Sequence, residues 1–230
     1  MGKMSVWIAI ALLLASVPLA CSAQAEPTLD DCAVVGVTAA VGLAETYVEG
    51  LIRTMVVLAA TAPVKAAYWD GMFGLLQTFQ EASLPMATWF VLPDGSYYTV
   101  DGGAASANLS DRAYFPVVMS GRIATGYFVV SRSTGRASMV TAVPVASDGQ
   151  IVGAVGVSLF LDSFSAVIAE DLALPDGVLF YAATEDGTIA LHSNLERLQA
   201  DVSLAGVIAD DTATRVSPLL GWGFGVGPAE

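Results

Sequence analysis

The stretch that decides the fold reads ASMVTAVPVASDGQIVGAVGVSLF and covers residues 137–160. Two apolar runs, Ala137–Ala146 and Gln150–Phe160, flank the dipeptide Asp148-Gly149. Aspartate and glycine tolerate the positive φ angles that tight turns require, so this pattern predicts an antiparallel hairpin. The same device recurs at Asp94-Gly95 and at Asp186-Gly187. Three such hairpins in one chain predict antiparallel sheet.

Apolar runs on either side of these turns predict further strands of the sheets. Gly102 to Gly126 is expected to be a loop that contains a short helix opening near Asn108. Ser133-Thr134-Gly135 supplies the turn into the central hairpin. The further strands predicted from these runs are Ala87–Leu92, Ser96–Val100, Tyr127–Ser131, Val178–Ala183 and Thr188–Leu191.

Helical periodicity dominates the first third of the chain and returns once between the sheets. Apolar residues recur at helical spacing from Val34 to Leu58, which predicts a long helix over roughly 28–60. Pro63 is tolerated in a first turn, so a second helix is expected to start there and to run to about Ala82. A third helix, 162–172, links the two groups of strands. The order predicts an α+β fold in which helices cover antiparallel sheets, with the arrangement repeated twice.

The N-terminus carries an export signal. Lys3 precedes a short apolar stretch, Val6 to Ala20, which is interrupted before it reaches the length of a membrane span. Two processing routes remain open. Cleavage after Ala25 would release a soluble chain, whereas lipidation of Cys21 would tether it to a membrane as a lipoprotein. Either route removes Cys21 as a disulfide partner for Cys32 and leaves about 205 residues, enough for one large or two small domains.

Charge restricts the class of partner. The chain has 22 acidic and 9 basic residues, which disfavours nucleic acid and anionic membrane surfaces. Four arginines nevertheless fall in one segment, and this local positive charge indicates an anion site. The alternative is that these arginines pair with nearby acids on loops. They are Arg112, Arg122, Arg132 and Arg136.

Enzymatic and metal chemistry find little support. His192 is the sole histidine, has no serine or acid partner that the sequence can assign, and is expected at the surface. The acids lack the spacing of a calcium loop, and two cysteines supply no metal motif. Gly153 and Gly156 lie in a strand rather than in a phosphate loop, and we expect them to allow close packing against the first helix. We therefore predict no enzyme, no metal and no cofactor.

Several segments together resemble the double Cache domains of prokaryotic extracytoplasmic sensors, whose two modules are PAS-like. None of these segments is unique to the family, but their order is fairly specific. They are LPDGSYYT (92–99), LSDRAYFP (109–116), VSRSTG (130–135), VPV (143–145), DGQIVGAVG (148–156), ATEDGTIALH (183–192) and GWGFGV (221–226).

The resemblance implies a long N-terminal helix followed by two PAS-like antiparallel-sheet modules, the larger membrane-distal and the smaller membrane-proximal. The expected divisions are a leader over 1–25, an N-terminal helical segment over 26–82 packed on the distal module, the distal Cache module over 83–165, and a linker helix with the proximal Cache-like module over 166–230.

The resemblance also implies a small-molecule pocket in the distal module, beneath the Asp-Arg-x-Tyr-Phe element. A guanidinium matches a carboxylate with two parallel hydrogen bonds, so Arg112 is the expected anchor. The alternative is that Arg112 pairs with Asp111 or caps a strand end. The remaining expected ligand-binding residues are Tyr114, Tyr127, Ser131, Ser158, Trp89 and Tyr98, of which Trp89, Tyr98 and Tyr127 would form walls.

One departure from the family narrows the ligand. Members that bind amino acids carry an acidic residue in the last distal strand for the ammonium group, and the matching position here is Ser158. A serine cannot balance a buried ammonium, which is costly unpaired. The expected ligand is therefore a small organic acid without an amine.

The predicted function is extracytoplasmic small-molecule binding, in signal transduction or ligand capture. Most family members continue into a transmembrane helix and a cytoplasmic signalling domain, whereas this sequence stops at Glu230. A separate membrane signalling protein or transporter is therefore the expected partner. The alternative function is a cell-envelope interaction or structural protein whose pocket no longer binds a ligand.

Overall fold

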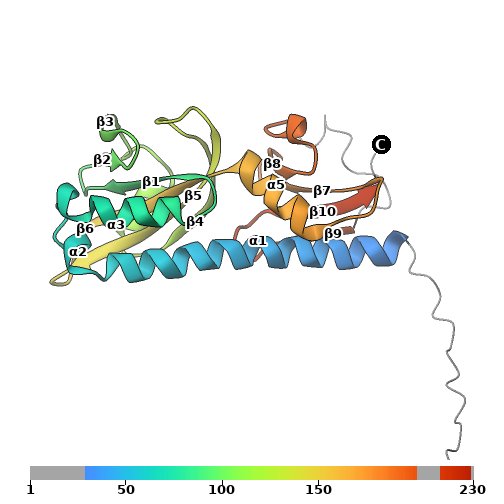
Figure 1. Cartoon of the computed structure of the whole chain (residues 1–230), viewed down its shortest axis with the longest axis horizontal. Coiled ribbons are helices and arrows are strands. Elements are labelled where there is room, and N and C mark those ends of the chain that lie inside the picture. Colours follow the sequence, from blue (N-terminus) through green and yellow to red (C-terminus); the bar gives the residue numbers. More distant parts are fainter. Residues whose placement is uncertain (1–28, 201–212, 229–230) are drawn as a thin grey trace, which may run out of the picture.

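Two antiparallel sheets lie end to end along one long helix in the computed structural model, which describes residues 29–200 and 213–228 (Figure 1). The six-stranded sheet and the helices on it, within residues 62–160, form the distal module. The four-stranded sheet, within residues 178–228, forms the proximal module. Helix α1 (Leu29–Ala59) runs beneath both. The structure thus has the α+β architecture with two sheet modules that the sequence predicts.

The distal sheet is built around the hairpin that opens the sequence argument. Its strand order is β3-β2-β1-β6-β5-β4, and every neighbouring pair is antiparallel. Asp148 and Gly149 both take positive φ at the central turn, as the Asp-Gly pattern predicts. The strands are β1 (Met86–Val91), β2 (Ser96–Thr99), β3 (Gly103–Asn108), β4 (Ala124–Val130), β5 (Ala137–Ser147) and β6 (Gln150–Phe160).

The proximal sheet is also antiparallel but has four strands, in the order β8-β7-β10-β9. The turn at Asp186-Gly187 joins its first two strands, with Gly187 at φ 85°. The described elements are β7 (Val178–Ala183), β8 (Ile189–His192), the 3₁₀ helix η1 (Leu195–Arg197), β9 (Ala213–Val216) and β10 (Gly223–Pro228). Strand β9 was not predicted from the sequence.

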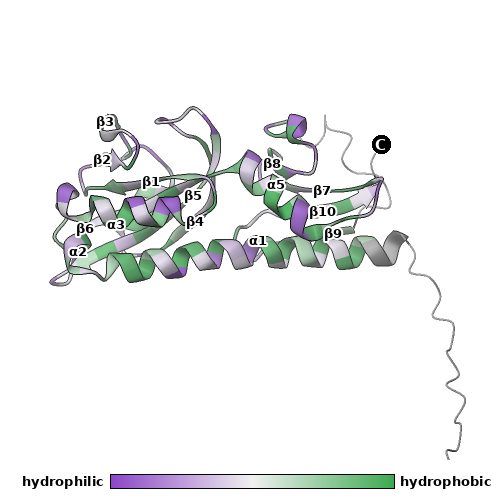
Figure 2. Cartoon of the chain, viewed as in Figure 1, coloured by the Kyte–Doolittle hydropathy of each residue, from purple (hydrophilic) through white to green (hydrophobic). Residues whose placement is uncertain are grey.

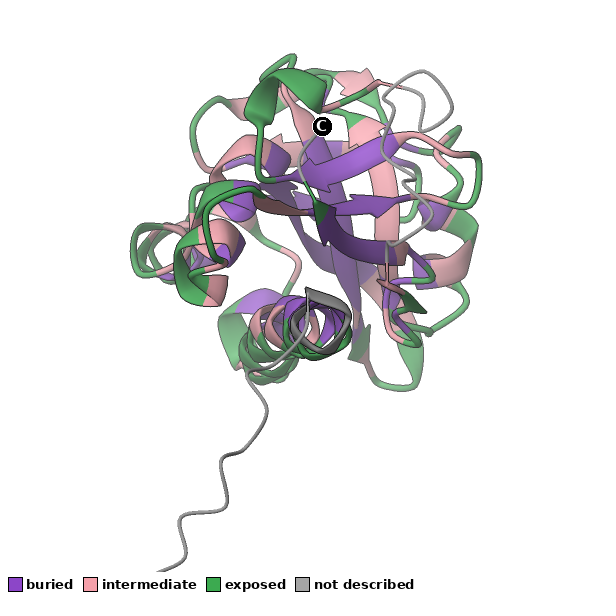
Figure 3. Ribbon diagram, turned by 90° about the vertical axis from the view of Figure 1, so that its right-hand side faces the viewer, coloured by how far each residue is buried: buried purple, intermediate pink, exposed green. Residues whose placement is uncertain are grey.

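Helix α1 buries one stripe and exposes the opposite side (Figure 3). Val37, Val41, Val48 and Met55 are buried at helical spacing, whereas Val35 is 69% exposed. The stripe packs against both sheets, so α1 contacts the proximal module in addition to the distal module on which the sequence predicts it to pack. Residues 33–59 are long and apolar enough to cross a membrane, but their inward side belongs to the core.

The predicted second helix is wrong in one respect, because it is two helices. Helix α2 (Ala62–Lys65) ends before Ala67, which has φ 51°, and α3 (Trp69–Glu81) starts again after it. Trp69 stacks on Tyr98 of β2, with ring centroids 5.2 Å apart. The break turns α3 so that it can lie across the sheet and bury Met72 and Leu76.

The predicted loop 102–126 contains more structure than expected. Strand β3 pairs with β2 at the edge of the distal sheet, and helix α4 (Tyr114–Met119) starts after Ala113 rather than near Asn108. Asn108 instead fastens the loop, because its side chain donates to the carbonyl of Asp94 and accepts from the amide of Ser110. The loop is therefore held over one face of the sheet.

Helix α5 (Leu161–Leu172) connects the modules as predicted, and the expected division between residues 165 and 166 lies inside it. A continuous buried cluster runs from α1 through both sheets, and a second cluster fills the other face of the distal sheet under α4. Hydrophobic colouring follows the buried strands, and hydrophilic colouring gathers on the loops (Figure 2). The leader over 1–25 and the lipidation expected at Cys21 lie outside the described residues.

Candidate functional site

The candidate site lies on the face of the distal sheet that is turned away from α1. Side chains alternate across a strand, so Trp89 of β1, Val140 of β5 and Ser158 of β6 share this face. The segment that contains Arg112 and Tyr114 covers them. Packing between the sheet and this cover leaves a small cavity.

The cavity has a volume of about 20 Å³, which is room for roughly one water molecule. Within the described part of the chain, its lining combines aromatic, aliphatic and hydroxyl groups with two arginines and no acid. The lining residues are Trp89, Tyr97, Leu109, Arg112, Tyr114, Val129, Ser131, Arg132, Ser133, Val140 and Ser158. We call this space the distal pocket.

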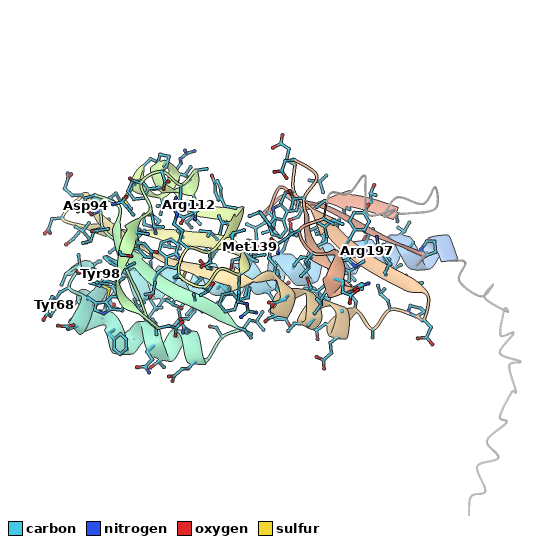
Figure 4. All side chains as sticks on the ribbon, turned by 90° about the horizontal axis from the view of Figure 1, so that it is seen from above. Tyr68, Asp94, Tyr98, Arg112, Met139 and Arg197 are labelled. Atoms are coloured by element: carbon cyan, nitrogen blue, oxygen red, sulfur yellow. The ribbon has the colours of Figure 1, made fainter. Side chains whose placement is uncertain are left out.

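Arg112 is half-buried at the pocket and lies within the body of the distal module (Figure 4). Its Nη2 donates a 3.3 Å hydrogen bond to the carbonyl oxygen of Val130, the last residue of β4. No carboxylate within the described ranges 29–200 and 213–228 pairs with it. The alternative that Arg112 pairs with Asp111 is wrong, whereas its contact at a strand end is observed.

Arg132 is the residue that pairs with Asp111. Its two terminal nitrogens donate to the two carboxylate oxygens at 2.9 and 2.6 Å, and Nη1 also donates to the carbonyl of Asn108. The hydrogen bond from Arg132 holds the pKa of Asp111 below its ordinary value. This pair clamps the loop after β4 onto the cover and largely neutralises one of the two arginines at the pocket.

Trp89 forms the floor because Gly156 on β6 leaves room for its ring, and Gly153 makes the same kind of room for Phe90 on the opposite face of the sheet. A Cβ on Gly156 would lie 2.1 Å from the Trp89 ring, and one on Gly153 would lie 2.5 Å from the Phe90 ring. The expectation that these glycines pack against the first helix is therefore wrong, since rings of β1 occupy the space. The indole Nε1 of Trp89 donates to Ser158 Oγ at 3.2 Å.

Tyr114 forms a buried wall, and burial raises the pKa of its hydroxyl to about 12. Its ring contacts that of Trp89 on one side and that of Tyr127 on the other, each with centroids 5.9 Å apart. Tyr127 stands behind Tyr114 and does not border the pocket. Of the predicted wall residues, Trp89 borders the pocket as its floor, whereas Tyr127 only supports the wall that Tyr114 provides.

Tyr98 is a correction, because it does not border the pocket. Register pairs Tyr98 with Phe90 and Tyr97 with Val91, so the two tyrosines point to opposite faces of the sheet. Tyr98 lies on the α3 side, stacked on Trp69, and Tyr97 lines the pocket in its place. Figure 4 places Tyr98 near Tyr68 at one end of the module and Arg112 nearer its middle.

Several solved structures share this architecture at low sequence identity. No protein-family model and no curated protein sequence matches the chain. The ligand-binding domain of the Pseudomonas fluorescens chemoreceptor CtaA, in complex with L-valine, matches with a TM-score of 0.68 and 14% identity over 88% of this chain and 98% of that chain.

Two further matches extend the comparison. The ligand-binding domain of the Pseudomonas aeruginosa PAO1 amino acid chemoreceptor PctC, in complex with GABA, gives a TM-score of 0.64 and 15% identity over 86% and 95% of the two chains. The sensor domain of the V. cholerae histidine kinase DctB gives 0.58 and 12% over 84% and 96%. The chain has the double Cache fold. Its neighbours in structure are ligand-binding and sensor domains by name.

The remaining arginines of the predicted positive segment have structural roles in this double Cache chain. Arg136 donates to Asp162 at the start of α5 at 2.6 Å, and its guanidinium lies 3.7 Å from the centre of the Phe160 ring. Arg122 is exposed and donates to Ser120 Oγ at 3.2 Å. The pairing alternative therefore holds for Arg132 and Arg136 but not for Arg112 or Arg122.

His192 is a second correction, because it is buried rather than at the surface. Only 2% of the residue is exposed, its Nδ1 accepts from the amide of Asn194 at 2.7 Å, and its own amide donates to Ser165 Oγ on α5. Burial, with a smaller effect from Arg197, lowers the pKa of His192 to about 4. The imidazole is therefore neutral at physiological pH, and the backbone amide of His192 joins the proximal sheet of the double Cache fold to α5.

No group of three or more histidine, cysteine, aspartate or glutamate side chains is arranged for a metal ion among the residues that the structure describes. The chemistry that the distal pocket offers is instead one guanidinium, several hydroxyls and aromatic walls. Sequence reasoning missed Tyr97, Arg132 and Ser133 as lining residues. Strand parity from Trp89 through the Asp94-Gly95 turn would have pointed to Tyr97.

Proposed function

We propose that the distal pocket of this double Cache chain binds a small organic acid without an amino group. The observation that carries the proposal is the state of Arg112, which lines a small cavity and forms no ion pair with a carboxylate in the described part of the chain. The family resemblance supplies the location, and the contacts of Arg112 supply the chemistry.

Electrostatics favours an anion at this place. The lining contains two arginines and no acid, and Asp111 already compensates Arg132. Arg112 therefore brings a positive charge to the pocket that no ion pair within the described residues takes up, although Asp111 is near enough to interact with it electrostatically. A carboxylate that accepts from Arg112 gains short, charge-assisted hydrogen bonds, which are stronger than the 3.3 Å bond to the neutral Val130 carbonyl that it would replace.

Ser158 argues against a ligand that carries an ammonium group. Its hydroxyl already accepts from the Trp89 indole, and no acid lines the pocket. An ammonium ion in this space would lose its hydration without gaining a counter-charge, which is costly. The L-valine and GABA that accompany the CtaA and PctC domains both carry an amine, so we propose a different ligand class for this chain.

The size of the pocket sets a condition on binding. A space of about 20 Å³ holds roughly one water molecule, so even a two-carbon acid requires the pocket to widen. Displacement of Arg112 from the Val130 carbonyl and a shift of the Ser131–Ser133 loop would provide that room. Ligand binding would then move the cover of the pocket, which suits a sensor.

We further propose that the chain acts outside the cytoplasmic membrane, without catalysis, and passes its signal or its ligand to a separate membrane signalling protein or transporter. The apolar segment 6–20 supports export, and the similarity to chemoreceptor and histidine kinase sensor domains supports a sensing role. Lipid attachment at Cys21 and cleavage after Ala25 are distinguished by the mass of the mature N-terminus.

A thermal-shift screen of the purified protein against acetate, lactate, pyruvate, succinate and a panel of amino acids tests the ligand class. A ligand at 100 times its dissociation constant adds about 2.7 kcal/mol, which raises Tm by roughly 5–10 °C for a chain of this length. We expect hits among the acids. Arg112→Ala should remove the shift, whereas Arg122→Ala should retain it, because Arg122 is exposed and lies outside the pocket.

A competing function is an envelope interaction protein with a closed pocket. The small volume and the hydrogen bond of Arg112 to the main chain favour it. If no acid raises Tm and Arg112→Ala leaves the unfolding curve unchanged, the binding proposal is wrong and this competing function stands.

A further inference from the structure

A second concave site lies between the two modules, away from the distal pocket. It has a volume of about 470 Å³, within the usual range for small-molecule sites, and domain junctions are a common place for them. The residues that line it are Gly126, Tyr127, Phe128, Thr184, Glu185, Asp186, Leu220, Gly221 and Trp222. We call this space the junction cleft.

The floor of the junction cleft is formed where the modules touch. Gly126 of edge strand β4 has φ 78°, and a Cβ there would lie 2.4 Å from the carbonyl oxygen of Leu220. The indole Nε1 of Trp222 donates to the Gly126 carbonyl at 2.9 Å. A glycine is therefore required at this close approach, and the floor is fixed from both sides.

The lining of the junction cleft combines aromatic and acidic residues. Tyr127 and Phe128 are half-buried on β4, and Glu185 and Asp186 lie on the turn between β7 and β8. The amide of Thr188 and the hydroxyl of Thr184 both donate to Asp186 Oδ1, which holds that turn in place. Among the residues that the structure describes, no lysine or arginine lines the cleft.

We propose that the junction cleft binds a small organic ammonium ion. Aromatic faces and carboxylates together attract an organic cation, whereas the anion proposed for the distal pocket would be repelled here. A calcium ion needs six to eight oxygen ligands, and no group of three acidic, histidine or cysteine side chains exists in the described ranges to supply them. The volume also suits an organic body better than a bare ion.

The matched pair tert-butylammonium and tert-butanol tests this proposal, because the two probes have similar shape and differ in charge. Each is titrated into the purified full-length protein at constant ionic strength, and the Trp222 indole N–H resonance is followed by NMR. We expect a saturable shift with the ammonium ion and none with the alcohol. An equal response to both probes, or no saturable response to the ammonium ion, would overturn the proposal.

Substitutions locate the binding. Glu185→Gln should weaken binding of tert-butylammonium about two- to five-fold, and Phe128→Leu by a similar factor. Glu185 is exposed, so its variant is expected to fold even if the Phe128 variant does not. Glu196→Gln, an exposed acid of the proximal module outside the cleft, is the matched control. Affinity unchanged by Glu185→Gln would contradict the assignment.

The test is independent of the acid ligand proposed for the distal pocket. Arg112 does not line the junction cleft, so Arg112→Ala should leave binding of tert-butylammonium unchanged. A response to the ammonium ion that disappears with Arg112→Ala would place the cation at the other site and overturn this proposal.

Discussion

Gly156 is the residue whose replacement tests the construction of the distal pocket most sharply. In the Gly156→Ala variant the new Cβ would lie 2.1–2.4 Å from three atoms of the Trp89 ring, closer than real Cβ contacts allow. The ring must therefore move toward the pocket or the strand must bend. Overpacking of this kind costs about 1–3 kcal/mol, so Tm should fall by roughly 2–12 °C.

The proximal module provides a matched control. Gly225 of β10 meets Tyr181 in the same way, with a Cβ 2.2 Å from the ring, and Tyr181 is the cross-strand partner of Gly225 just as Trp89 is of Gly156. Gly225→Ala should cost a similar amount of stability while leaving the distal pocket intact.

Differential scanning calorimetry and titration with an acid that binds the parent protein separate the two effects. Both variants should melt earlier, and only Gly156→Ala should lower the affinity for the acid, by tenfold or more at a cost of about 1.4 kcal/mol. Equal affinity in the two variants would refute the claim that Trp89 forms the floor of the ligand site.

Three further predictions concern single side chains. Ser158→Asp places a carboxylate at the pocket, so the affinity for amine-free acids should fall and amino acids should begin to bind. Calorimetric titration that finds the variant still binding amine-free acids in preference to amino acids would contradict the proposed selectivity. The pKa of His192 is lowered from 6.5 to about 4 in the folded protein. The stability that the neutral imidazole contributes is therefore complete above pH 6.5 and is lost as the pH falls through 4, by at most about 3 kcal/mol. Urea unfolding should show this loss in the parent protein and not in His192→Gln. Trp222→Phe removes the indole N–H that donates to the Gly126 carbonyl and should lower the free energy of unfolding by about 1–3 kcal/mol. Unchanged urea unfolding curves would show that this hydrogen bond between the modules does not contribute to stability.

Most of the sheet architecture could be predicted from the sequence because the residues at each turn themselves determine its backbone conformation. Gly95, Gly149 and Gly187 all adopt the positive φ that their Asp-Gly positions predict. Strand β3 escaped prediction because the sequence GAASAN has none of the β-branched or aromatic residues that mark strands. Backbone pairing with β2 at the sheet edge forms it instead.

The side-chain partners of the site could not be predicted from the sequence alone. Asp111 stands next to Arg112 in the chain but pairs with Arg132, which is 21 residues away. That choice depends on how the loop after β4 folds back over the cover, which no local pattern encodes. The break at Ala67 is similar, because alanine favours helices and the stacking of Trp69 on Tyr98 is a contact between residues far apart in the sequence.

A crystal structure of the protein with an acid that raises its Tm tests the central claim most directly. The account predicts one ligand carboxylate about 2.7–2.9 Å from the Arg112 guanidinium, inside a widened pocket floored by Trp89 and walled by Tyr114. A carboxylate bound elsewhere, with Arg112 still donating to the Val130 carbonyl, would contradict it.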